Sequence, residues 1–538
     1  MTTHVDVAPV EPVRREALPR WLVVAGLSVV GLLLLANLAS LLSYINFALN
    51  YPFQLDYGEG IVWQQARNIW AGEGYGPLQI FPAVVYHYPP LYHLTFEALA
   101  AWTGMDEMVA GRIVSIVSSA LSALMVGMLT SAVIGSAENA KTRAVCGVFA
   151  ALLFLASFPV RMWTPLMRVD MLAVLLGAAG LWFAWRALRR PHLIYVASAL
   201  FVLGVYVKQI SIAPPAAAYL VLLVTHRPLA LRGLAAAICM GLLGLAIEQW
   251  LNGGQFLQHI VGYNVNRLAL HLLWEILLPQ LMEHAAMIAL GVLGATGGWL
   301  YVRRVAAGDA GHRRDRIAND PKAVLILMLI LFVGLKTIML AAMVKSGANA
   351  NYMIDWFSGI AIFAGVAIAP YVAYALGGAA TAGRPASIAI LFMALPVQLA
   401  MMLSLYAGQP TTDTIASLRR DKQPVVDLIA ASDRPVIADD MTFTIRAGRK
   451  VEWESAITAE LGAKGVYDQK GLARLIRAHC FGLFAVDGIL GEGVSVSRYD
   501  PVTIAAIHEA YPRTQRYAKY MLYFPDAPAD PAICASIH

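Results

Sequence analysis

Two carboxylates lie three residues apart in a glycine-rich stretch of the sequence, Leu55-Asp56-Tyr57-Gly58-Glu59-Gly60. Because glycine permits tight backbone turns, such a stretch can bend sharply. A carboxylate held beside an acceptor hydroxyl can remove its proton during nucleophilic attack, which is general-base catalysis. The alternative is that Asp56 and Glu59 cap or solvate a helix that begins near Gly60, where negative charge is favoured. The spacing alone leaves both interpretations open.

Several cationic residues border or interrupt apolar runs elsewhere in the chain. Charges at a membrane boundary are costly and often functional, and lysines and arginines at that level would hold a lipid phosphate. The alternative for each residue is snorkelling, or pairing with a neighbouring carboxylate. The residues are Arg161, Arg168, Lys208, Arg267 and Lys345, and Asp170 begins the helix expected after Arg168.

The composition predicts the frame that must position these residues. The chain is 59% hydrophobic and only 14% charged, with a mean hydropathy of +0.62, whereas a soluble chain is about 45–50% apolar and about 25% charged. So little polar surface could not cover so large a core in water. We therefore expect an α-helical polytopic membrane protein, and the formal charge of +6 does not suggest a nucleic-acid binder.

Eleven apolar runs could cross about 30 Å of hydrocarbon, at 21–43, 113–135, 144–160, 169–187, 192–207, 209–225, 231–250, 276–302, 323–344, 353–376 and 386–406.

The basic connections between these runs predict the orientation, because lysines and arginines accumulate on the cytoplasmic side. If the N-terminus and the connections at 186–190 and 303–316 lie inside, the eleven runs must alternate, and the C-terminal part lies outside. Counting the short segment Pro89–Trp102 as a further span would reverse every later connection. We therefore expect an interfacial or re-entrant helix there, within a long first outer loop at 44–112. The expected location is the inner (cytoplasmic) membrane.

The C-terminal part has a different character. Charges appear after about residue 407, and short β-like runs at Pro435–Ala438, Phe481–Val486 and Met521–Phe524 alternate with helical ones such as Leu472–His479. This pattern predicts a small α/β domain. The expected division is 1–20 as a cytoplasmic segment, 21–406 as the membrane domain and 407–538 as the outer domain. Asp439 and Asp440 are interpreted as turn residues after a strand, and Cys480 and Cys534 could form a disulfide in an oxidising compartment.

The membrane part contains motifs whose order resembles the GT-C superfamily of membrane glycosyltransferases. The resemblance covers about residues 45–360 and is strongest for the bacterial branch, which is related to protein O-mannosyltransferases and aminoarabinose transferases. The motifs are Asp-Tyr-Gly-Glu-Gly at 56–60, Gly-Glu-Gly-Tyr at 72–75, Tyr-Pro-Pro-Leu-Tyr at 88–92, Gly-Arg-Ile-Val-Ser at 111–115, Arg-Val-Asp at 168–170, Lys-Gln at 208–209 and Gly-Ala-Asn-Ala-Asn-Tyr at 347–352.

The resemblance implies transfer of a sugar from a polyprenyl-phosphate donor on the outer side of the membrane, with inversion at the anomeric carbon. It also implies an acidic base in the first outer loop. Many relatives carry adjacent Asp-Glu there, whereas Gly58 stands here at the position of that aspartate, before Glu59. This departure leaves the base open between Asp56 and Glu59, and we expect Asp56 with Glu59 assisting. By the same resemblance Lys208, Arg168 and Lys345 would bind the lipid phosphate, and His87, Tyr88, Asn351 and Tyr352 would line the sugar or acceptor pocket.

The leading expectation is therefore a hexosyl- or pentosyltransferase that acts in cell-envelope polysaccharide biosynthesis. Its partners would be the polyprenyl-phosphate sugar, a glycan, lipid or protein acceptor, and membrane lipids. Nothing in the sequence demands a cofactor, although Asp56, Glu59 and His87 could hold a divalent cation such as Mg, Mn or Ca. The alternative functions are a transporter or flippase of lipid-linked saccharides, for which we find no internal repeat, and a non-catalytic scaffold.

Overall fold

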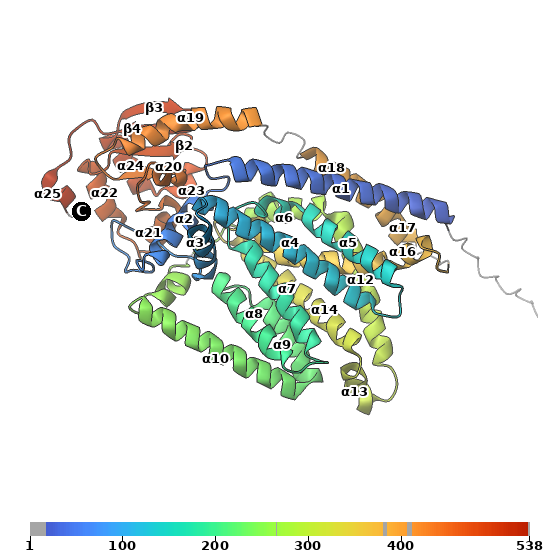
Figure 1. Cartoon of the computed structure of the whole chain (residues 1–538). Coiled ribbons are helices and arrows are strands. Elements are labelled where there is room, and N and C mark those ends of the chain that lie inside the picture. Colours follow the sequence, from blue (N-terminus) through green and yellow to red (C-terminus); the bar gives the residue numbers. More distant parts are fainter. Residues whose placement is uncertain (1–17, 265, 380–384, 406–411, 536–538) are drawn as a thin grey trace, which may run out of the picture.

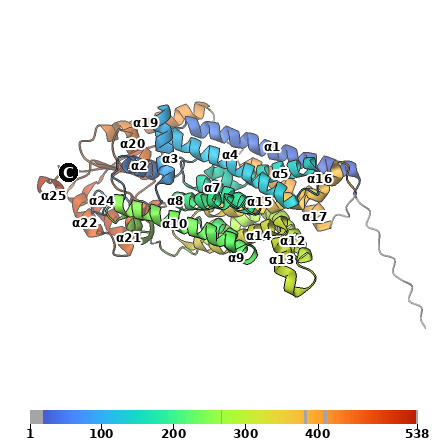
Figure 2. The same ribbon diagram turned by 60° about the horizontal axis from the view of Figure 1, so that its bottom comes forward.

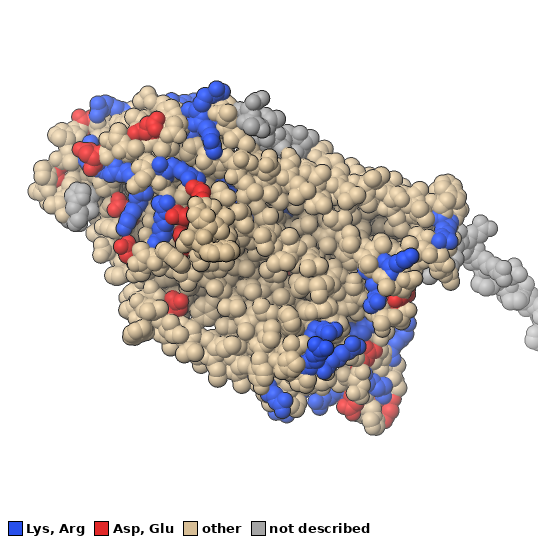
Figure 3. All heavy atoms as spheres, viewed as in Figure 1, with Lys and Arg blue, Asp and Glu red and all other residues tan. Residues whose placement is uncertain are grey.

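The computed structural model describes residues 18–264, 266–379, 385–405 and 412–535. It consists of a long helical bundle with a small α/β domain at one end (Figure 1). On the face drawn in Figure 3, charged residues gather at the two ends of the molecule and leave an uncharged band between them. The expected cytoplasmic residues 1–17 and the expected domain boundary near 406 lie outside the described residues.

Seven helical stretches are long and apolar enough to cross a membrane. They are α1 (Arg20–Asn50), α4 (Glu107–Ile134), α10 (Arg227–Leu251), α12 (Ala285–Val305), Pro321–Val344 with α14 (Pro321–Met339), Ala350–Ala367 with α15 (Ile354–Ala367), and Ala386–Ser404 with most of α18 (Leu395–Leu405). Together with the uncharged band, they make this a multi-pass membrane protein.

The other four predicted runs are helical but shorter. They form α5 (Ala140–Ala156), α7 (Asp170–Arg186), α8 (Leu193–Val207) and α9 (Ala213–Thr225). At 1.5 Å per residue these helices extend over about 20–26 Å, less than the hydrocarbon thickness of about 30 Å. All eleven predicted runs are therefore helical, and the crossing of these four stays a prediction.

Small residues allow the helices of the bundle to approach closely. A Cβ atom on Gly127 of α4 would lie 2.9 Å from the carbonyl oxygen of Gly147 on α5, and one on Gly147 would lie 2.8 Å from that of Gly127. Such small-residue contacts are typical of membrane helices, where backbone proximity replaces the hydrophobic effect. α7 packs against α4, α8 and α9, so the loop that precedes it is held firmly in the bundle.

The C-terminal domain contains a four-stranded sheet with the order β1-β2-β4-β3. β1 (Val436–Ala438) pairs parallel to β2 (Leu483–Asp487), and β4 (Tyr520–Phe524) runs antiparallel to β2 and to β3 (Arg513–Tyr517). The three predicted strands and the helix predicted at Leu472–His479, observed as α22 (Gln469–Arg477), are confirmed. β3 was missed because it is a mostly exposed, polar edge strand that lacks an apolar signal.

Asp439 and Asp440 lie in the bend after β1, as predicted, but both are also buried and paired. Asp440 pairs at 3.2 Å with Lys422 of α19 (Thr412–Ala430). Asp439 accepts hydrogen bonds from the Tyr499 hydroxyl at 2.9 Å and from Arg498 Nη1 at 3.1 Å. The two carboxylates therefore fasten helices and loops of the domain to its sheet.

The C-terminal domain rests on the segment 44–112, which is predicted to be the first outer loop. Figures 1 and 2 show α2 (Gly58–Trp70) and α3 (Leu91–Thr103) at the junction of the bundle and the domain. The Ala83 backbone amide donates to the Glu452 carbonyl at 2.7 Å, and the side-chain Nε2 of Gln54 donates to the Asp439 carbonyl at 3.0 Å. α3 is the segment expected not to span. It packs against α2 and α4, and its depth in the membrane stays a prediction.

The structure joins Cys480 and Cys534 in a disulfide and leaves Cys146 and Cys239 as free thiols. We predict that a maleimide labels two cysteines of the denatured, unreduced protein and four after reduction. Because the bond closes a separation of 54 residues, its loss should destabilise the domain by about 4 kcal/mol. Labelling of all four cysteines before reduction, measured by intact mass, would contradict the pairing.

Candidate functional site

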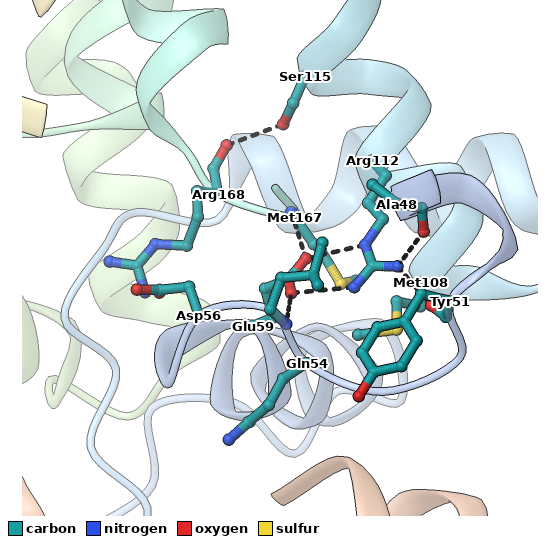
Figure 4. A network of polar contacts seen from close by, with 12 residues as sticks. Ala48, Tyr51, Gln54, Asp56, Glu59, Met108, Arg112, Ser115, Met167 and Arg168 are labelled. Carbon is teal, nitrogen blue, oxygen red and sulfur yellow. Dashed lines mark hydrogen bonds and ion pairs between the residues drawn. The ribbon is translucent and has the colours of Figure 1, made fainter. Parts of the chain in front are cut away.

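A buried ion pair joins the segment 44–112, the predicted first outer loop, to the membrane bundle. Arg112, in the first turns of α4, donates from Nε and Nη2 to Glu59 Oε1 and Oε2 of α2, each at 3.0 Å (Figure 4). Both side chains have zero exposure. Each carboxylate oxygen also accepts a backbone amide, from Met167 at 2.9 Å and from Leu55 at 2.6 Å. The remaining donors of Arg112 bind the backbone carbonyls of Ala48, Tyr51 and Phe53.

This environment holds the Glu59 carboxylate in place. Its carboxylate makes four hydrogen bonds and has no contact with solvent, so it cannot approach an acceptor hydroxyl without breaking the pair. Removing one partner of a buried ion pair typically costs about 3–5 kcal/mol. Burial in this pair disfavours the expectation that Glu59 assists as a base, and the role of Glu59 in catalysis stays a prediction.

Asp56 lies in a second ion pair close by. Its Oδ2 accepts from Arg168 Nη1 at 3.0 Å and from the Gly58 amide at 3.0 Å. Unlike Glu59, Asp56 keeps 26% of its side chain exposed, and Arg168 keeps 16%. Burial alone would lower the pKa of Arg168, but the neighbouring acidic groups, Asp56 first and then Tyr88, Asp170 and Glu59, together move that pKa upward. Arg168 is therefore a permanent cation at a partly open position.

Gly58 makes room for this pair. A Cβ atom at Gly58 would lie 1.3 Å from Arg168 Nη1, so the guanidinium occupies the space that a side chain would fill. The departure of this chain from the Asp-Glu pattern of the GT-C resemblance thus has a physical correlate. The carboxylate two residues earlier, on Asp56, pairs with Arg168, and the Arg168 guanidinium fills the space that a side chain at position 58 would take.

A third pair continues the same segment of chain. Asp170, at the start of α7, accepts from Lys208 Nζ at 2.5 Å and from Asn351 Nδ2 at 2.9 Å, and both bonds go to Oδ1. The other oxygen, Oδ2, is buried and has no hydrogen-bond partner among the described residues. Lys208 Nζ also lies 5.2 Å from the ring centroid of Tyr352, a cation–π contact. The Tyr88 hydroxyl lies near enough to both Lys208 and Arg168 to interact electrostatically with each of them.

His87 lies where the C-terminal domain borders the site. Its carbonyl accepts from Gln209 Nε2 at 2.8 Å, and its Nε2 lies 3.9 Å from Glu454 Oε2. Glu454 is only 6% exposed, and this oxygen accepts no hydrogen bond from any described residue. The site therefore has an unsatisfied carboxylate oxygen that faces His87 from the other domain.

Three of the predicted cations lie elsewhere. Lys345 is exposed, and its backbone pairs with Leu268; no side-chain contact connects it to the ion pairs above within the described part of the chain. Arg267 pairs with Glu460 of the C-terminal domain at 3.1 Å. Arg161 is buried and donates to the Ser40 hydroxyl of α1. The structure thus joins Asp56, Arg168, Lys208, Tyr88, His87, Asn351 and Tyr352 into one region and leaves Lys345 outside it.

Sequence reasoning missed two residues of this region. Arg112 was part of a recognised motif, and a charge within an otherwise apolar helix could have singled it out. Glu454 had no such signal, because only the fold brings the C-terminal domain against His87.

The candidate cation ligands do not converge. Glu59 is occupied by Arg112, Asp56 by Arg168, and His87 faces Glu454. Across residues 18–264, 266–379, 385–405 and 412–535, no group of three His, Cys, Asp or Glu side chains is placed to hold a metal ion. Binding of a divalent cation stays an untested expectation.

No protein-family model and no curated protein matches this sequence. Solved structures do match. ArnT from Cupriavidus metallidurans bound to undecaprenyl phosphate has a TM-score of 0.56 at 13% identity, over 92% of this chain and 97% of that one. The chain has the GT-C fold. The apo form of that ArnT matches with a TM-score of 0.55 and the same coverage, and the apo oligosaccharyltransferase of Archaeoglobus fulgidus with 0.50 at 11% identity, over 86% of this chain and 69% of that one.

The GT-C resemblance predicted from the motifs is thereby confirmed at the level of the fold. At identities of 11–13% the likeness does not transfer an activity.

We predict that Glu59→Gln lowers the thermal unfolding midpoint of the purified protein, because it leaves Arg112 buried without a countercharge. The expected loss in the free energy of unfolding is about 3–5 kcal/mol. The matched control is Glu73→Gln, since Glu73 pairs with Lys450 at 3.0 Å with both side chains more than half exposed. Such surface pairs contribute about 0–1 kcal/mol. Equal midpoints for the two variants would show that the Glu59–Arg112 pair is not structural.

Proposed function

We propose that this protein is an inverting glycosyltransferase that transfers a hexosyl or pentosyl group from a polyprenyl-phosphate donor to an acceptor at the outer face of the membrane. The observation that carries the proposal is the pairing of a partly exposed carboxylate, Asp56, with a cation, Arg168, beside a second cation, Lys208. A glycosyltransferase of this type needs a base for the acceptor and cations for a departing phosphate. The fold, which is shared with an ArnT bound to undecaprenyl phosphate, supports the same class of donor.

Arg168 and Lys208 are suited to the donor phosphate. A guanidinium binds a phosphodiester with two parallel hydrogen bonds, and an ammonium adds a compact charge. Without donor each cation is neutralised by a carboxylate, Arg168 by Asp56 and Lys208 by Asp170. A donor phosphate that reaches Arg168 competes with Asp56 for the guanidinium. We infer that the exchange releases Asp56 toward the acceptor when the donor is bound.

The chemistry then follows from that arrangement. The oxygen of the acceptor hydroxyl attacks the anomeric carbon from the face opposite the phosphate, and the bond between that carbon and the phosphate oxygen breaks. Asp56 accepts the hydroxyl proton, and polyprenyl phosphate departs as an anion held by Arg168 and Lys208. A single displacement of this kind inverts the anomeric centre.

His87, Tyr88, Asn351 and Tyr352 are proposed to line the sugar and acceptor pocket, together with Glu454. The buried Glu454 oxygen without a partner is suited to accept a hydrogen bond from a sugar hydroxyl, because an unsatisfied buried carboxylate oxygen is otherwise costly. In the proposed orientation the N-terminus lies on the cytoplasmic side of the inner membrane, and the C-terminal domain lies on the outer side, where it closes the pocket. The acceptor would be a glycan, a lipid or a protein.

We predict that Asp56→Asn lowers kcat by about 100-fold or more, because the amide cannot take the proton. The donor Kd should stay unchanged or fall, because Arg168 no longer has a competing carboxylate. The measurement is transfer from a labelled polyprenyl-phosphate sugar by purified protein, with Glu73→Gln as the control at an exposed carboxylate of the same loop. Full activity of Asp56→Asn would overturn the base assignment. Lipid movement across liposomes by wild type, without transfer from any such donor, would identify a transporter instead.

A second prediction concerns Gly58. In Gly58→Ala the new methyl group takes the place of Arg168 Nη1, and the flexible side chain can move away without disturbing the fold. Because the guanidinium is then displaced from the position in which it would bind the donor phosphate, we expect the donor KM to rise about tenfold. The thermal midpoint should stay nearly unchanged. Gly76→Ala is the matched control, since a Cβ atom there meets nothing within 4 Å. Equal KM values for the two variants would contradict the role of Arg168.

A further inference from the structure

A cavity opens at the end of the bundle away from the C-terminal domain. Its volume is about 840 Å³, within the range of about 300–1,000 Å³ typical of ligand sites. α4, α5 and α7 line it together with the start of α14. α4 runs from the junction with the C-terminal domain toward the opposite end (Figure 1), and the cavity follows only its second half, from Ala123 to Gly135. It is therefore distinct from the candidate site.

The inner wall of the cavity is apolar. Leu124, Met128, Val148 and Ala151 line it. From Leu124 to Gly135 the helix rises about 16 Å, which corresponds to the thickness of about one hydrocarbon leaflet. An occupant that fills this length beside the membrane must itself be apolar along most of it.

The mouth of the cavity is cationic. Arg143, Arg186, Arg189 and Lys322 line it, with Asp320 as the only carboxylate among the described lining residues. Asp320 already accepts from the Tyr301 hydroxyl at 2.7 Å and from the amides that begin α14. None of the three arginines has an ion-pair partner in the described chain, and Arg143 Nε is buried without a hydrogen-bond partner.

Aromatic residues mark the depth of these cations. The guanidinium of Arg186 lies 5.9 Å from the rings of Trp182 and Trp185, and Lys322 Nζ lies 4.5 Å from the ring of Tyr301. Tryptophan and tyrosine concentrate at the headgroup level of a bilayer. On the face drawn in Figure 3, Lys and Arg also gather at this end of the molecule.

We propose that this cavity binds one anionic glycerophospholipid of the leaflet opposite the catalytic face. Its phosphate lies between Arg143 and Arg186, and an acyl chain lies along α4 and α5. The combination of unpaired cations at the mouth and an apolar wall of leaflet depth fits an anion with a hydrocarbon tail. Basic pockets between membrane helices bind anionic lipid headgroups in this manner.

The test is a lipid titration of the delipidated, full-length protein followed by native mass spectrometry, with phosphatidylglycerol and phosphatidylcholine as probes. Wild type should bind phosphatidylglycerol about tenfold more tightly than phosphatidylcholine, because the headgroup retains a net negative charge. The double variant Arg143→Gln, Arg186→Gln should lose this preference. The matched control is Arg303→Gln, Arg304→Gln, which removes two exposed charges at the end of α12, outside the cavity.

A second variant fills the space without changing the charge. Ala144→Trp places an indole at an exposed lining position of α5. It should weaken the binding of both lipids. This variant tests whether the lipid occupies the cavity even if the double arginine variant does not fold. Equal affinities of wild type for the two lipids would overturn the proposal. So would a loss in the control variant as large as that in the cavity variant, or unchanged binding by Ala144→Trp. None of these outcomes depends on transferase activity.

Discussion

The ion pair between Glu59 and Arg112 is the interaction on which the arrangement of the site depends. A charged residue without exposure is stable only if it is paired and its other hydrogen-bonding groups are satisfied. Arg112 meets this requirement with Glu59 and the end of α1, and Glu59 meets it partly with the Met167 amide. The loop before α7 is thereby fixed against α2. Arg168 in that loop and Asp170 at the start of α7 then make the other two pairs.

The three ion pairs differ in one property that matters for function, which is access. The Glu59–Arg112 pair is closed on all sides, whereas Asp56 and Arg168 are partly exposed, and Asp170 has one oxygen without a partner. Cations that bind an anionic substrate at a membrane boundary need another countercharge before the substrate arrives, because an unpaired charge there is costly. Carboxylates supply it, and exchange of a carboxylate for a phosphate conserves the local charge. In the proposed function, the same exchange would couple donor binding to release of Asp56 as the base.

Much of the frame could be predicted from the sequence, because it depends on local composition. Apolar runs gave the helices, and alternating short runs gave β1, β2 and β4. Pairing between distant residues could not be predicted in this way. Glu59 and Arg112 are 53 positions apart, and nothing in the Asp-Tyr-Gly-Glu-Gly motif indicates which carboxylate is buried. Lys345 resembled the other cations in sequence, and only the fold separates it from them.

The most direct test of the account is a structure of the protein with polyprenyl phosphate bound, determined by cryo-electron microscopy. The account predicts that the phosphate contacts Arg168 and Lys208 and that Asp56 no longer lies within hydrogen-bond distance of Arg168, while the Glu59–Arg112 pair is unchanged. A phosphate bound elsewhere, with the Asp56–Arg168 pair intact, would contradict it.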